Sequence, residues 1–68
     1  MRLESELDRL GIKYTTEIIN NTKFIRTENN IRVLISKDSV TLSTNNDNCT
    51  LPPTIDSLRY ILEVIKNG

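Results

Sequence analysis

The stretch IKYTTEIINNTKFIRTE, residues 12–28, carries the clearest strand pattern in this chain. Its first part, Ile12 to Ile19, is rich in β-branched residues, and its successive side chains alternate between the two faces of an extended strand. Asn20-Asn21 follows, and asparagine tolerates the positive φ angles of a tight turn. A second strand is expected from Thr22 to about Glu28. The stretch therefore predicts a β-hairpin.

The residues after this hairpin predict two more strands and a long loop. Asn29-Asn30 makes a second turn, and the third strand, Ile31 to Ser36, places apolar side chains on one face at every other position. Lys37-Asp38 then turns the chain into a fourth strand, Ser39 to Thr44. The segment Asn45 to Pro53 is rich in asparagine and proline and predicts a loop.

Amphipathic helices are predicted at both ends of the chain. The first spans Arg2 to Leu10, and Gly11 follows it, where a left-handed residue commonly ends a helix. Its apolar stripe consists of Leu3, Leu7 and Leu10. Thr54 is the expected N-cap of the second helix. The apolar stripe of that helix consists of Ile55, Leu58, Ile61, Leu62 and Ile65.

Together these elements predict an α+β fold in the order α-β-β-β-β-α. It is a four-stranded antiparallel β-meander flanked by an N-terminal and a C-terminal helix, and the short connections favour neighbouring strands. The length of 68 residues suits a single small α+β domain, residues 1–68. Cys49 is the only cysteine, so no internal disulfide reinforces a core of this size. We therefore expect reinforcement from a homodimer or from a protein partner.

The residue types that are absent exclude several kinds of catalytic site. Histidine is absent, which rules out a Ser-His-Asp triad, a Cys-His pair and a histidine metal site. Gly11 and Gly68 are the only glycines, so the chain has no glycine-rich loop for phosphates. We expect no enzyme activity, no cofactor and no metal, and we expect Cys49 to be an unreactive loop thiol.

The main candidate for function is the sheet face that the helices leave free. If both helices cover one face, the other carries apolar side chains among charges and hydroxyls, which is typical of an interface. Phe24 and Ile25 are adjacent, so one of them faces away from the helices unless a bulge turns both inward. The candidate partner-binding residues are Ile19, Phe24, Ile25, Arg32 and Leu34. We expect a non-enzymatic protein-binding module that acts through a sheet face or an edge strand.

One alternative is a purely structural homo-oligomer, and the other is a small nucleic-acid-binding protein with a basic patch on the sheet. Its candidate residues are Lys13, Lys23, Arg26 and Arg32. Phe24 lies among these cations in sequence, as in a sheet that stacks bases, or else it simply fills the core. Nine basic and nine acidic side chains give a net charge of zero, so the composition shows no electrostatic footprint for phosphates.

Composition also suggests an origin and a compartment. Alanine, which needs GC-rich codons, is absent, whereas isoleucine and asparagine, which use AT-rich codons, are frequent. This pattern indicates an AT-rich genome and fits an accessory or inhibitor protein of a phage, another virus or a mobile element. The charged N-terminus does not resemble a signal peptide, and no apolar stretch approaches the ~20 residues of a membrane span. We expect a cytoplasmic protein, in the host cytoplasm if it is viral.

Overall fold

Two helices and five strands make up the part of the chain that the computed structural model describes, residues 2–67. In chain order they are α1 (Leu3–Leu10), β1 (Tyr14–Ile19), β2 (Thr22–Thr27), β3 (Arg32–Ile35), β4 (Val40–Ser43), β5 (Asn48–Leu51) and α2 (Ile55–Asn67). The strands form one antiparallel sheet in the order β1-β2-β3-β4-β5. The predicted α+β class with flanking helices is confirmed, and the sheet has one strand more than predicted.

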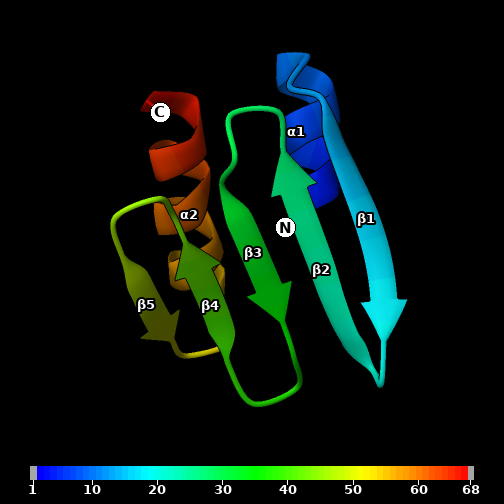
Figure 1. Ribbon diagram of the computed structural model, residues 1–68, viewed down its shortest axis with the longest axis vertical. Coiled ribbons are helices and arrows are strands. Elements are labelled where there is room, and N and C mark those ends of the chain that lie inside the picture. The colour runs from blue at the N-terminus through cyan, green and yellow to red at the C-terminus, as the bar shows by residue number, and fades with distance from the viewer. Residues whose placement is uncertain (1, 68) are drawn as a thin grey trace.

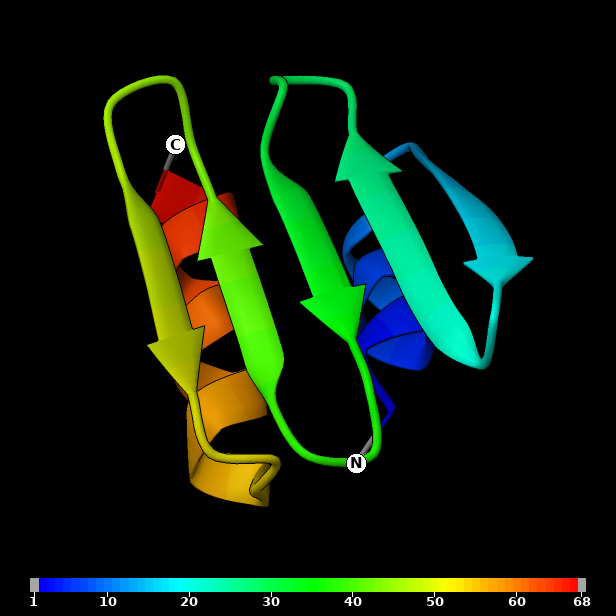
Figure 2. The same cartoon turned by 60° about the horizontal axis from the view of Figure 1, so that its bottom comes forward.

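Both helices lie on the same face of the sheet. Figures 1 and 2 show α1 behind the half of the sheet that contains β2, and α2 behind the half that contains β4. No described element covers the opposite face, which we call the open face. No helix within residues 2–67 has both the length and the apolar character that a membrane span requires.

The predicted turn residues adopt the backbone conformations that their types favour. Asn20 and Asn21 have φ angles of 51° and 64°, as a two-residue hairpin turn with positive φ at both positions requires. Gly11 ends α1 with φ 72°, and its N–H donates to the carbonyl of Asp8. At the start of α2, the hydroxyl of Thr54 accepts a hydrogen bond from the N–H of Ser57 at 3.3 Å. The sequence therefore sets these boundaries locally.

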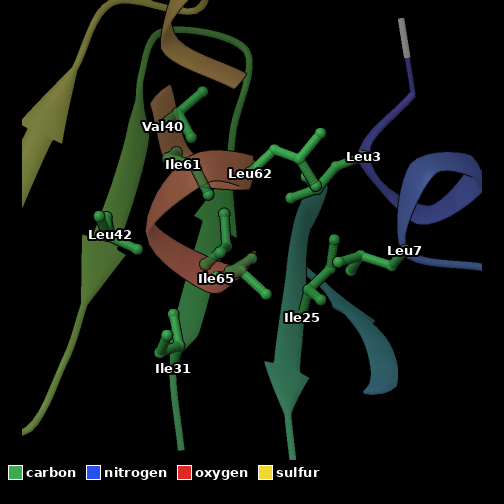
Figure 3. Close-up of a cluster of buried hydrophobic side chains, with 10 residues drawn as sticks. Leu3, Leu7, Ile25, Ile31, Val40, Leu42, Ile61, Leu62 and Ile65 are labelled. Carbon is green, nitrogen blue, oxygen red and sulfur yellow. The ribbon is translucent and has the colours of Figure 1, made fainter. Parts of the chain in front are cut away.

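The hydrophobic core lies between the helices and the covered face of the sheet (Figure 3). Its buried members are Leu3, Leu7, Ile25, Ile31, Val33, Val40, Leu42, Ile61, Leu62 and Ile65. Ile25 is fully buried, so it faces the helices, whereas Phe24 lies on the open face. The strand needs no bulge, because regular alternation places the two neighbours on opposite faces.

Ile55 does not belong to the core-facing stripe of α2, contrary to the prediction. It is 52% exposed, whereas Ile61 and Ile65 are almost completely buried. At about 100° per residue, Ile55 stands roughly a quarter turn away from the line that Ile61 and Ile65 define. A stripe read from spacing alone therefore extended one residue too far.

The segment from Asn45 to Pro53 is not simply a loop, because it contains β5. The N–H of Thr44 donates to the carbonyl of Asp47 at 2.8 Å, and this bond closes a tight turn around Asn45-Asn46. Beyond the turn, β5 pairs with β4 in a register that sets Leu51 opposite Val40. Pro52-Pro53 ends the strand, since proline has no N–H for the ladder.

A candidate interface on the open sheet face

The open face is defined by the residues that point away from the helices in each strand. They are Thr15, Glu17 and Ile19 in β1, Thr22, Phe24 and Arg26 in β2, Arg32 and Leu34 in β3, Thr41 and Ser43 in β4, and Asn48 and Thr50 in β5. Most of them are polar or charged. The apolar exceptions all lie on the first three strands, so the open face has a distinct apolar end.

Phe24 and Leu34 form the centre of that apolar end. The two residues are directly opposite each other in the β2–β3 register, and both are half-buried although no helix covers them. Ile19 lies nearby and is 47% exposed. The surface here is hollowed, with a volume of about 420 Å³ lined by side chains of β1, β2 and β3. A concave apolar surface of this size suits a side chain or short segment of another molecule.

Two arginines border this hollow. Arg26 and Arg32 are opposite each other in β2 and β3. They form the next cross-strand pair after Phe24 and Leu34 on the open face. Like charges directly opposite each other destabilise a sheet, so this pair is unfavourable for folding alone. Neither arginine is among the ion pairs found within residues 2–67, and Arg26 donates only to the amide oxygen of Asn30, at 3.1 Å. A carboxylate from a partner would offset this repulsion.

Most of the predicted partner-binding residues lie together on this surface. Ile19, Phe24, Arg32 and Leu34 all line the hollow through β1, β2 and β3. Ile25 is the exception, because its side chain is fully buried in the core on the covered side of the sheet. Arg26, which was not among the predicted partner-binding residues, also lines the hollow. The position of Arg26, two residues after Phe24 in the same strand, could have predicted this placement, because residues i and i+2 of a strand share a face.

The predicted basic patch does not assemble as a set of four cations. Lys23 points to the covered side, where its Nζ donates to Oε2 of Glu4 in α1 at 2.6 Å. This contact holds the pKa of Glu4 below its ordinary value. Lys13 lies just before β1 and near Arg26. Of the four predicted cations, Lys13, Arg26 and Arg32 therefore share the open side of the sheet, and Lys23 does not.

Cys49 lies in β5 and not in a loop. It is half-buried, opposite Leu42, on the side of the sheet that the helices cover. Cys49 lines a second, shallow hollow together with Tyr60 and Val64 of α2. Within residues 2–67 no three histidine, cysteine, aspartate or glutamate residues are grouped so as to hold a metal ion.

The comparisons with known proteins do not add a family to these observations. Compared with models of protein families, with curated proteins and with solved structures, this chain has no match.

Proposed function

We propose that this chain is a non-enzymatic protein-binding module whose open face binds an acidic segment of a partner protein. One observation carries the proposal: the apolar pair Phe24 and Leu34 lies next to Arg26 and Arg32, which have no carboxylate partner among the described residues. Such a surface suits a segment in which aspartate or glutamate accompanies a large apolar side chain.

The energetics of binding favour such a segment over a purely charged one. An aromatic residue and arginines at the centre of an interface commonly contribute most of the binding free energy. Hydrogen bonds from guanidinium groups to carboxylates strengthen when neighbouring apolar groups exclude water. Phe24 and Leu34 provide that apolar surrounding, and the hollow provides room for an anchoring side chain.

The biological role that we propose is that of an accessory or inhibitor protein of a phage or mobile element. The AT-rich codon signature of the composition supports this part of the proposal. A module without its own chemistry acts by occupying a surface that its partner needs for another contact. Such a role requires only the open face and a stable scaffold behind it.

A peptide-display selection with matched variants tests the binding proposal. The wild-type protein is the bait, and the affinity of each selected peptide is then measured for wild type and for the variants. We expect the retained peptides to carry acidic residues beside a large apolar residue, and to lose affinity at least about tenfold for Leu34→Lys and for Arg32→Glu. Thr50→Lys is the control, because it adds the same charge to the open face on β5, away from the hollow.

Two results would contradict the proposal. Selected peptides that bind Leu34→Lys as tightly as wild type would place the interface elsewhere, provided that the variant melts normally. Tight binding of single-stranded oligonucleotides with a steep salt dependence would instead favour the nucleic-acid alternative, in which Lys13, Arg26 and Arg32 contact phosphates. The same variants distinguish the outcomes, since Leu34→Lys would then strengthen binding.

A further inference from the structure

We propose that the free edge of β1 pairs antiparallel with β1 of a second copy of this chain, so that one sheet runs through a two-fold symmetric dimer. This inference concerns a different surface from the open face and does not rest on the proposed function. Figure 2 shows β1 at one edge of the sheet, with no element on its outer side.

The hydrogen-bond pattern of the β1–β2 hairpin decides which backbone groups are free at this edge. Ile19 and Thr22 flank the two-residue turn, and at the other end the N–H of Glu28 donates to the carbonyl of Lys13 at 3.2 Å. Odd-numbered residues of β1 are thus bonded to β2. Because bonding alternates along an antiparallel strand, the N–H and C=O groups of Tyr14, Thr16 and Ile18 point outward from the sheet.

The two edges of the sheet differ in how well they are protected. The β5 edge is short, its outward residues Asn48 and Thr50 are polar, and Pro52 follows it directly. The β1 edge is longer and has no proline or lysine within Tyr14–Ile19, where Glu17 is the single charged residue. These are the devices that natural proteins use to prevent edge-to-edge pairing.

Ile18 marks the β1 edge as a contact surface. Its side chain is on the covered side of the sheet but is 70% exposed, the highest value among the large apolar residues that are exposed. The opposite residue on β2 is Lys23, whose amine reaches to α1, so no apolar neighbour covers Ile18 from that strand. A second strand beside β1 is the missing neighbour.

Symmetry and hydrogen bonding together select one register. A two-fold axis perpendicular to the sheet at Thr16 sets Tyr14 opposite Ile18 of the other copy, Thr15 opposite Glu17, and Thr16 opposite itself. In this register every outward N–H and C=O of Tyr14, Thr16 and Ile18 gains a partner. It also places an aromatic ring against the exposed isoleucine on the covered side, a favourable cross-strand pair.

The neighbouring registers are less favourable. Centring the pair on Glu17 brings two carboxylates directly opposite each other, which destabilises a sheet, and leaves Tyr14 opposite the turn residue Asn20. Centring it on Thr15 requires the N–H of Ile12, which already donates to the carbonyl of Leu7 at 3.0 Å. Charge therefore disfavours the register centred on Glu17 and backbone bonding disfavours the one centred on Thr15, which leaves the pair centred on Thr16.

Sedimentation equilibrium across a dilution series of the full chain measures the proposed dimer. We expect wild type to associate reversibly to a dimer, and Ile18→Lys to weaken that association at least about tenfold. The exposure of Ile18 means that this variant should melt as the wild-type monomer does. Thr50→Lys is the matched control, because it adds the same charge to the opposite edge strand.

Cysteine cross-linking in a Cys49→Ser background tests the register. Thr15→Cys and Glu17→Cys lie opposite each other across the proposed dimer at a closely spaced pair without hydrogen bonds. A mixture of the two single variants should form a disulfide-linked dimer on mild oxidation, whereas neither variant alone should do so. Cross-linking of Glu17→Cys alone would show the register centred on Glu17 and overturn the proposed one.

The failure of this inference is distinguishable from the failure of the proposed function. A wild-type chain that remains monomeric throughout the dilution series, or a dimer that Ile18→Lys does not weaken, would overturn the β1 pairing. Neither result bears on peptide binding. Conversely, Leu34→Lys should weaken peptide binding at least about tenfold and leave the dimer unchanged, since its side chain lies on the open face of β3.

Discussion

Substituting threonine for each of the neighbours Phe24 and Ile25 should have very different effects on stability. Threonine is the chosen residue because it suits a strand at either position, so the difference reports the environment of the side chain. Ile25 is completely buried between the sheet and the helices, where Figure 3 shows it next to Leu7. Phe24 lies on the open face beside water.

The structure gives the magnitude of each effect. Ile25→Thr removes an ethyl group, about 1.6 kcal/mol at about 0.8 kcal/mol per buried carbon. It also buries a hydroxyl without a partner, at about 1–3 kcal/mol. The sum of roughly 3–5 kcal/mol is comparable with the whole stability of about 3–5 kcal/mol that a domain of this size commonly has. Phe24→Thr leaves its hydroxyl hydrated and loses a cross-strand contact with Leu34, at about 1 kcal/mol.

Urea and thermal unfolding followed by circular dichroism measure both variants. We expect Ile25→Thr to be largely unfolded at 37 °C, and Phe24→Thr to fold with a Tm lowered by about 4–8 °C. Ile25→Val is the control, because it keeps the branched shape and should cost about 0.5–1.5 kcal/mol. Equal losses for the two threonine variants, or the larger loss for Phe24→Thr, would refute the assignment of Ile25 to the core.

Three further predictions concern positions outside the open face. Gly11→Ala should lower the free energy of unfolding in urea by about 1 kcal/mol because Gly11 has φ 72°, although a Cβ at this position would meet no atom within 4 Å. Gly11→Asn should cost less, and equal costs would show that the φ angle does not set the penalty. The hydrogen bond from Lys23 lowers the pKa of Glu4 below its ordinary value of 4.5. The stabilisation from this ion pair is therefore fully present at a pH above 4.5, and it is lost as the pH falls through the lowered pKa that Glu4 has in the folded protein. Glu4→Gln should therefore flatten the acid limb of Tm against pH, and an unchanged limb would show that the pair contributes nothing. Cys49→Ser should lower the free energy of unfolding by more than about 0.5 kcal/mol, because the thiol is half-buried. Thr50→Ser is the control and should lower it by less than about 0.5 kcal/mol, because Thr50 is exposed. An equally small loss for both variants would place Cys49 at the surface.

Much of the fold could be predicted from the sequence, because it depends on interactions between residues that are close together in the chain. The alternation of apolar residues in Ile31 to Ser36 predicts which side chains face the helices, because the period of a strand is two. The turn at Asn20-Asn21, the end of α1 at Gly11 and the cap of α2 at Thr54 each follow from residue types whose preferred backbone angles or hydrogen bonds act within a few residues. Such features need no knowledge of the rest of the chain.

The fifth strand shows where local rules were misleading. Asn45-Asn46 has the same composition as the hairpin turn at Asn20-Asn21, and the residues after it alternate, with Cys49 and Leu51 facing the helices. The polar composition and the two prolines favoured a loop over a strand. Asn48–Leu51 becomes a strand because the edge of β4 has free N–H and C=O groups with which it can pair. This pairing depends on the tertiary structure and not on the local sequence.

The composition of the open face was also decided by the tertiary structure. The sequence offered Phe24 and Ile25 as equivalent candidates, and only the positions of the helices assigned Ile25 to the core. Lys23 looked like part of a basic patch until α1 placed Glu4 within 2.6 Å of it. Arg26 and Arg32 became a pair only through the register of β2 and β3. In each case the deciding contact joins residues distant in sequence, and no local preference encodes such a contact.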